Sequence, residues 1–262
     1  EELITLSDQM VADGNTPWCI GVESGNATGW TATDWMEDIM LRTTTPENYD
    51  RWVSNDLAFN SPEVINAMEM YGSFSRNDDY VAGGAASVAT TFFGDAPKGL
   101  FSSPASCMMH RQASFIPAFF PKKGEEVVNG EADFFYFPPF ASQNLGRPVL
   151  GAGTLYTMTK ESAATRAFFD YLQEAKAHEA WMSQGAFLTA HKGASPAAYA
   201  SEAQRKQGEI LTTATTFRFD ASDLMPGAIG AGAFWSEMTA FANGQDAKTT
   251  ADNIQAAWDA IK

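Results

Sequence analysis

The sequence has few basic residues and few cysteines. Lysine and arginine together number 17 against 32 aspartates and glutamates, so the net charge is −15 at pH 7 and the isoelectric point is near 4.5. A chain of that charge is repelled by nucleic-acid phosphates and by anionic membrane surfaces. The composition therefore argues against a nucleic-acid partner and leaves a neutral or cationic ligand open.

Long apolar runs and the short motifs of common catalytic centres are also missing. No stretch of about 18 apolar residues predicts a membrane span. The first four residues, EELI, are not a signal peptide, so we expect the chain to begin as a mature or trimmed product. No CxxC, HExxH, P-loop or GxSxG motif occurs, and the histidines His110, His178 and His191 are far apart. These absences argue against a metal site and predict no cofactor.

The two cysteines, Cys19 and Cys107, are an even number but say little on their own. In an oxidising compartment they could form a disulfide bond. In the cytosol they would be two small buried hydrophobic side chains. The residues alone leave both alternatives open.

Apolar residues recur at helical spacing in some stretches and form short continuous runs in others. Short strands alternating with longer helices are typical of a layered α/β fold. The predicted strands are 18–22, 99–104, 133–139 and 147–158. The predicted helices are 3–11, 30–41, one from 62, 87–93, one from 107, one capped by Thr159 with Phe168, Phe169 and Leu172 inward, one with Trp181 and Met182, 198–213, 234–241 and one from about 249.

Loops at strand ends are where such folds bind ligands, and three candidates are 23–30, 104–112 and 220–235. The last is rich in glycine and is expected to be a flexible apolar loop that delivers Phe234 and Trp235 to the start of a helix. A tryptophan ring there suits stacking on a sugar, because C–H bonds and an aromatic face match in shape and polarity. The alternative is a tryptophan of the core that follows a loop.

Polar side chains in these loops offer two kinds of chemistry. Glu23 with Asp220 or Asp223 could form the carboxylate pair of a glycoside hydrolase, although loop carboxylates more often face solvent or accept bonds from sugar hydroxyls.

The run His110-Arg111-Gln112 falls at a predicted helix start, and its donors suit hydroxyls or an anionic group. The alternative is a solvated turn. Trp30 is a second ring that could stack on a sugar, whereas Trp35 lies further into its helix and is assigned to the core.

Several segments occur in an order that resembles a known family. Met225-Pro226 followed at similar spacing by Phe234-Trp235 is similar to a segment of maltodextrin receptors in which the tryptophan stacks on a sugar ring. The other matching features are the acidic loop with Glu23 and Trp30, the strand that ends in proline at 133–139, and the glycines Gly151 and Gly153 before a capped helix. The chain thus resembles the substrate-binding proteins of bacterial ABC sugar importers, and within them the α-glucoside-binding group.

That resemblance implies a type II periplasmic-binding-protein-like α/β fold. Residues 1–147 and 194–262 would form the second, C-terminal lobe, and 148–193 would be the crossover segment of the first lobe. The rest of the N-terminal lobe would be largely missing ahead of the first residue. Apolar surfaces in 148–193 are then expected to be exposed unless a further segment or chain covers them.

The resemblance also implies function. It predicts a monomeric, periplasmic or membrane-associated receptor that binds an α-glucoside such as maltose, sucrose or trehalose, closes about a hinge, and is read by a membrane permease. It predicts no catalysis and a disulfide between Cys19 and Cys107. The implied ligand-binding residues are Glu23, Trp30, His110, Arg111, Gln112, Gly151, Gly153, Asp223, Met225, Phe234 and Trp235.

Two other functions remain open from the sequence. One is a glycoside hydrolase that uses Glu23 and Asp223, and the other is a lectin-like carbohydrate-binding domain.

Overall fold

The computed structural model describes residues 2–121, 132–185 and 187–262. Within them, no helix combines the length and the hydropathy that a membrane span requires. The α-helices are α1 (Glu2–Ala12), α2 (Trp30–Thr43), α3 (Pro46–Val53), α4 (Pro62–Ser75), α6 (Ala163–Leu172), α7 (Ala175–Met182), α8 (Glu202–Thr212), α9 (Ala221–Leu224), α10 (Trp235–Ala242) and α11 (Ala247–Ile261). The strands are β1 (Pro148–Gly151) and β2 (Thr216–Phe219), and η7 (Ala228–Phe234) is a π-helix.

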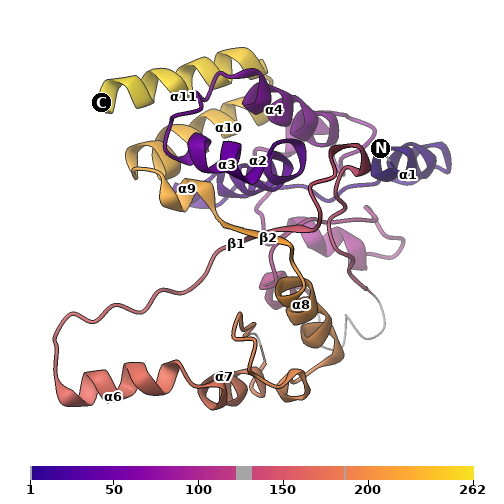
Figure 1. The fold of residues 1–262 in the computed structure, drawn as a ribbon. Coiled ribbons are helices and arrows are strands. Elements are labelled where there is room, and N and C mark those ends of the chain that lie inside the picture. Colours follow the sequence, from indigo (N-terminus) through magenta and orange to yellow (C-terminus); the bar gives the residue numbers. More distant parts are fainter. Residues whose placement is uncertain (1, 122–131, 186) are drawn as a thin grey trace.

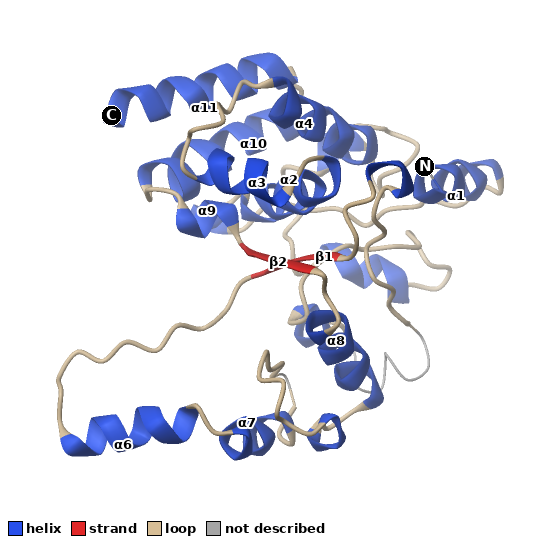
Figure 2. Cartoon of the chain, in the orientation of Figure 1, coloured by secondary structure: helices blue, strands red, loops and turns tan. Residues whose placement is uncertain are grey.

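Two groups of helices lie on either side of the strand pair (Figure 1). Helices α1 to α4 and α9 to α11 form the upper group, and α6 to α8 form the lower one. The strands β1 and β2 lie between the groups, where the chain leaves the upper group and returns to it (Figure 2). The predicted lobe boundary at residue 194 stays a proposal. Helix α8, which follows residue 194, lies in the lower group, and the chain returns to the upper group through β2.

The strands β1 and β2 are parallel, in a register that pairs Pro148 with Thr216 and Gly151 with Phe219. Parallel strands cannot be joined by a tight turn, so the connection has to be long and here contains α6, α7 and α8. The ladder is closed by the amide of Asp220, which donates to the carbonyl of Gly151 at 3.0 Å. Gly151 lies against the Phe217 ring, where a Cβ atom would approach the ring to 2.5 Å.

Helix α2 is the centre of the upper group. Every side chain from Thr31 to Arg42 is buried, and α2 packs against α4, α10 and β1. One face is apolar and includes Trp35, Met36 and Ile39 of the hydrophobic core. Burial on all sides also removes charged side chains of α2 from water, which is tolerated only where they are paired.

The segment 220–235 is not the flexible loop that its glycines predict. Its described path is α9, then η7, which runs directly into α10. Gly230 is fully buried, and a Cβ atom there would overlap the carbonyl of Ser222. The glycine is therefore needed for close packing of η7 on α9 and not for mobility.

The expected strands 18–22, 99–104 and 133–139 are also wrong. The first is buried as predicted but makes only isolated bridges, from Trp18 to Val81 and to Met109, and its amides bond in turn to different segments. Among the described residues, no segment runs beside it far enough to build a ladder. Residues 99–101 fall in a 3-10 helix, and the strand at 147–158 ends at Gly151.

Some helix predictions are confirmed and others are wrong. The predicted helices match α1, α2, α4, α10 and α11 closely, and α8 more loosely. The helices expected at 87–93 and from 107 do not form, and α3 was missed although Thr45 caps it and Pro46 begins it. Ser162, and not Thr159, caps α6.

The lower group carries exposed apolar side chains. No residue of α6 is buried, so the expectation that Phe168, Phe169 and Leu172 all point into a core is wrong, and Phe169 and Leu172 are only half-buried. Leu155 is 81% exposed. Exposure of apolar surface in this segment is what the resemblance implies. Three aromatic side chains of this part of the chain are also exposed, namely Tyr156, Phe168 and Tyr171.

Gly230→Ala is expected to destabilise the protein by about 1–3 kcal/mol, because the added methyl overlaps the Ser222 carbonyl and forces η7 away from α9. Gly232→Ala is the matched control, since the nearest atom to its Cβ would be 3.5 Å away. Urea unfolding followed by circular dichroism measures both. Equal stability of the two variants would contradict close packing of η7 against α9 at Gly230.

Candidate ligand-binding site

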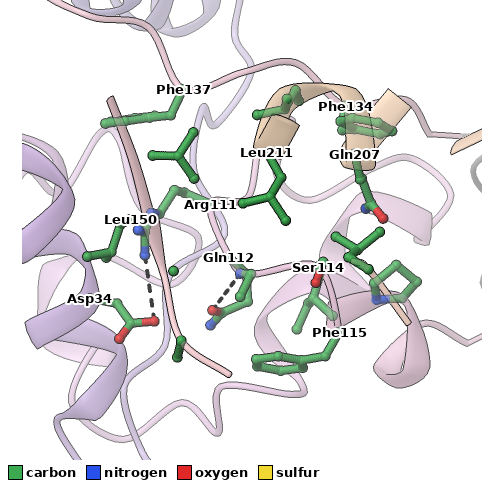
Figure 3. Close-up of a pocket in the computed structure, with 18 of the residues that line it drawn as sticks. Asp34, Arg111, Gln112, Ser114, Phe115, Phe134, Phe137, Leu150, Gln207 and Leu211 are labelled. Atoms are coloured by element: carbon green, nitrogen blue, oxygen red, sulfur yellow. Dashed lines mark hydrogen bonds and ion pairs between the residues drawn. The ribbon is translucent and has the colours of Figure 1, made fainter. Parts of the chain in front are cut away.

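A cavity of about 1770 Å³ opens between the two groups of helices. Figure 3 shows part of it, with Asp34 and Arg111 on one side and Gln207 and Leu211 on the other. The upper group contributes α2, the segment 107–117, residues 132–137 and the start of α10. The lower group contributes α7, α8 and residues 184–185 and 187–190. Side chains from distant parts of the sequence therefore meet at one space.

Most of the residues predicted from the sequence lie at this cavity. The lining contains Trp30, His110, Arg111, Gln112, Gly151, Gly153, Asp223 and Trp235. Three others, Glu23, Met225 and Phe234, are not part of it.

Burial and local bonding explain the three exceptions. Phe234 is 0% exposed and packs edge-on against Trp52 and tightly against Phe59, with ring centroids 5.7 and 5.0 Å away. Met225 belongs to the same core and is 5% exposed. Glu23 turns back on its own loop, where Oε1 accepts from the Gly25 amide at 2.6 Å. The predicted ligand contacts of Phe234 and Met225 are thus wrong in this arrangement, and Glu23 and Asp223 are not brought together at the cavity.

Trp30 and Trp235 come to the cavity together because of Gly29. Gly29 caps α2 with a φ of 106°, a backbone conformation that residues with a side chain rarely adopt. A Cβ atom there would overlap the Trp235 carbonyl, so the first turns of α2 and α10 touch through this glycine. Trp30 is steadied on its other side by Phe93, whose ring centroid is 5.1 Å away in an edge-on arrangement.

The segment 107–113 presents polar side chains without forming a helix or strand. Cys19 and Cys107 are joined by a disulfide with their Cα atoms 5.4 Å apart. The Cys19 amide donates to the Met109 carbonyl at 2.8 Å, and the Met109 amide donates to Pro17 at 2.7 Å. His110 then places Nδ1 2.7 Å from the Cys19 carbonyl. The covalent link and these bonds fix a short extended segment that would otherwise have no partner.

Arg111 is held by carboxylates of α2 and lies over the Trp35 ring. Its Nη2 donates to Asp38 Oδ2 at 3.0 Å, Nη1 lies 3.9 Å from Asp34 Oδ2, and its guanidinium is 5.6 Å from the Trp35 ring centroid. Asp38 also pairs with Arg42 one turn further along α2. Residues 34, 38 and 42 thus form a charged stripe, in which each group has an opposite charge beside it.

Arg42 joins this stripe to the strands. Its guanidinium donates to the carbonyls of Phe137 at 2.8 Å and of Pro148 at 3.3 Å, and Arg42 is 2% exposed. Bonds from a charged donor are stronger than neutral ones. The segment before β1 and β1 itself are therefore tied to the centre of the upper group.

A second polar cluster joins α2 to the start of α9. The two carboxylate oxygens of Glu37 accept from the amides of Ala221 and Ser222, each at 3.1 Å. Asp34, Glu37 and Asp220 each place an oxygen within 4.8 Å of the others, so the group could hold a hard cation or share protons. Burial of Asp34 and Glu37 beside a third carboxyl favours shared protons, although the two amide bonds to Glu37 by themselves favour its ionised form.

Burial raises the pKa of the Asp34 and Glu37 carboxyls well above their usual range. Desolvation is the largest cause for both, and the neighbouring Asp220 charge acts in the same direction. Burial and Asp220 also raise the pKa of Asp223. The pKa of His110 is lowered to about 4, first by burial, with the Arg111 charge acting in the same direction. The imidazole is therefore neutral near pH 7.

Sequence reasoning missed the charged face of α2. The signal was present, because Asp34, Asp38 and Arg42 recur every four residues in the helix, and such a spacing places them on one face. The opposite wall was also missed. Tyr156 and Trp181 stack there, with ring centroids 6.0 Å apart and planes at 23°.

Among solved structures, the fold superposes on a chitin oligosaccharide binding protein with a TM-score of 0.77 at 14% identity, covering 99% of this chain and 63% of that one. It superposes on AcbH, a bacterial solute receptor described as having an exclusive preference for β-D-galactopyranose, with a TM-score of 0.81 at 18% identity, covering 99% and 64%. The chain thus shares the fold of these two proteins, which is the fold class that the resemblance predicted.

Sequence comparison finds relatives among proteins of known role. Residues covering 100% of this chain are 55% identical over 263 positions to the alpha-glucosides-binding periplasmic protein AglE of Rhizobium meliloti (strain 1021). The chain is 42% identical over 258 positions to the osmoprotective compounds-binding protein GgtB of Synechocystis sp. (strain ATCC 27184 / PCC 6803 / Kazusa), covering 98% of this chain. No protein-family model matches.

The chain is therefore a homologue of bacterial solute-binding proteins, and the resemblance predicted from its sequence is confirmed. It spans 57% of the length of AglE and 60% of the length of GgtB.

Replacing both cysteines, as Cys19→Ser with Cys107→Ser, is expected to lower the free energy of unfolding by about 2–5 kcal/mol, because the bond closes a long loop with a sequence separation of 88. Urea unfolding with and without a thiol reductant measures the effect. The reductant should destabilise the wild type and leave the double variant unchanged. An equal response of the two proteins would show that the bond does not form.

The contribution of the Asp34 and Glu37 carboxyls to stability is expected to fall as pH rises from about 4, the region of ordinary carboxyl pKa values. The lowered pKa of His110 contributes in the opposite direction between about pH 4 and 6.5, so the comparison with a Glu37 variant isolates the carboxyl contribution. Asp34 and Glu37 have raised pKa values when folded, so the folded protein keeps protons that the unfolded chain releases. Stability from this source is complete below the unfolded pKa and is lost as pH rises through the folded pKa. Urea unfolding of wild type and Glu37→Gln across pH 4 to 9 tests this, and the variant should show a shallower fall.

The control for that series is Glu69→Gln, which removes one negative charge at an exposed position of α4. Its pH dependence should follow the wild type. A Glu37→Gln profile parallel to both would contradict proton sharing in the cluster.

Proposed function

We propose that this chain is the ligand-binding part of a sugar receptor that serves an ABC importer. The observation that carries the proposal is the pairing of Trp30 and Trp235 at a cavity whose same wall bears Asp34, Asp220 and Arg111. Flat rings stack on the C–H faces of a sugar, and carboxylate and guanidinium groups bond to its hydroxyls. One wall thus offers both kinds of contact that a carbohydrate needs.

The ligand that fits this proposal is an α-glucoside, such as maltose, sucrose or trehalose. Support comes from AglE, which matches the whole chain at 55% identity and is an alpha-glucosides-binding periplasmic protein. GgtB binds osmoprotective compounds, so a small glucoside that acts as a compatible solute belongs in the same test. The sizes of these sugars suit an open cavity with aromatic groups on both walls.

Binding would close the two groups of helices about the strand pair. Gly151 and Gly153 line the cavity at the point where the chain leaves β1, so a rotation there would move α6 to α8 toward Trp30 and Trp235. Closure excludes water from the charged wall and strengthens its bonds to hydroxyls. The closed form is what a membrane permease would recognise, and the site of action would be the periplasm. We propose a receptor without catalytic activity, acting as a monomer.

Trp235→Ala in the full-length protein is expected to weaken sugar affinity at least about tenfold, because truncating a central ring at an interface commonly costs 2 kcal/mol or more. Isothermal titration calorimetry with maltose, sucrose and trehalose measures the change. Trp235→Phe should retain part of the affinity, since a smaller ring still stacks.

Phe92→Ala is the control, because Phe92 is an exposed ring outside the cavity lining. Its affinity should equal that of the wild type. Equal affinity of Trp235→Ala would contradict the proposal. Release of glucose during the titrations would favour the hydrolase alternative, and agglutination of glycan-coated beads would favour a lectin.

A further inference from the structure

His110 contains a buried hydrogen-bonding atom that has no partner among the residues that the structure describes. Its ring lines the cavity, and Nε2 is buried without a hydrogen bond to any of them. A buried polar atom left unpaired costs free energy, so a native site normally supplies a partner from the protein, from water or from a ligand. The atom therefore marks a contact that the described residues do not complete.

The other ring nitrogen decides the chemistry of this atom. Nδ1 lies 2.7 Å from the carbonyl oxygen of Cys19, and a carbonyl oxygen only accepts. The proton must therefore be on Nδ1. Because burial lowers the pKa of His110 to about 4, the ring carries that one proton near neutral pH, and Nε2 presents a lone pair.

The neighbours of His110 in the sequence are already engaged. Arg111 donates to Asp38, and the side-chain oxygen of Gln112 accepts from the Ala113 amide at 2.8 Å. The disulfide and the Cys19 carbonyl hold the imidazole in place, so the lone pair has a fixed direction. For His110 alone this corrects the sequence-based expectation that the run offers donors, because its free atom is an acceptor.

We propose that His110 Nε2 accepts a hydrogen bond from one hydroxyl of the bound sugar and makes the site selective for ligands with a donor at that position. The inference rests on the proposed function. A site built to bond a hydroxyl discriminates strongly against analogues that lack it, because the buried partner is then left unpaired. An O-methyl sugar keeps the oxygen and loses the donor, so it should be rejected as well.

The direct test is long-range ¹H–¹⁵N NMR of the full-length protein labelled with ¹⁵N-histidine, in a titration with the sugar that calorimetry shows to bind. We expect His110 to carry its proton on Nδ1 in the free protein, and its Nε2 resonance to shift at saturation. His191 lies outside the cavity lining and serves as the internal control. A proton on Nε2, or an Nε2 resonance that stays still while calorimetry shows saturation, overturns the proposal.

A variant series gives a second readout. His110→Phe should weaken binding of the parent sugar about tenfold or more. The deoxy or O-methyl analogue that lacks the hydroxyl donor facing His110 should bind His110→Phe and wild type equally. The wild type cannot form the hydrogen bond with this analogue, and the variant cannot form it with any sugar. His110→Gln, which restores an oxygen acceptor, should recover part of the affinity.

Loss of affinity by one common factor for every analogue would mean that His110 only supports the segment, and would overturn the proposal. A panel in which no sugar binds the wild type would overturn the proposed function and this role with it. Thermal melts of each variant confirm that the fold is retained.

Discussion

The charged face of helix α2 is the constraint on which the rest of the structure depends. Because α2 is buried on all sides, its charged groups lose most of their contact with water and need hydrogen-bond or ion-pair partners. The partners are the segments that connect the two groups of helices. Arg42 donates hydrogen bonds to carbonyls before and within β1, and Glu37 accepts hydrogen bonds from the amides that follow β2. The same helix that organises the core thus holds both crossing strands.

The same buried ion pairs and hydrogen bonds support both the wall of the cavity and the crossing strands. Asp34 and Asp38 face the cavity and also hold Arg111, which lies over Trp35 of the core. A ligand that bonds to these carboxylates would compete with Arg111 for them. Removing one member would leave a buried charge unpaired, which is far more costly than losing an exposed ion pair. Binding at the proposed site would therefore be coupled to folding through a few buried groups.

The sequence predicted the helices better than the strands, for a physical reason. Caps such as Ser61-Pro62 and apolar spacing act locally, so α4 and its neighbours could be placed. A strand needs a partner, and the run 18–22 has a different neighbour at almost every residue. Gly230 was misread because a glycine required for close packing looks, in sequence, like a glycine required for mobility.

The candidate site was predictable only in part. Trp30, Trp235 and the run 110–112 follow from the loops and from the family resemblance. The tautomer of His110 does not, because it is set by the Cys19 carbonyl, 91 positions away. The charges of α2 showed the right spacing, but nothing local says which face of a helix that is buried all round meets a cavity.

Contact at Gly29 has one more consequence. Because the first turns of α2 and α10 touch there, Trp30 and Trp235 belong to a single rigid body. Trp181 is carried by the lower group. Any rotation about the strand pair changes the separation between Trp181 and the other two indoles, while the spacing within the pair stays constant. The distances from Trp181 to Trp30 and to Trp235 therefore report the relative orientation of the two groups of helices, and the distance between Trp30 and Trp235 serves as the internal reference.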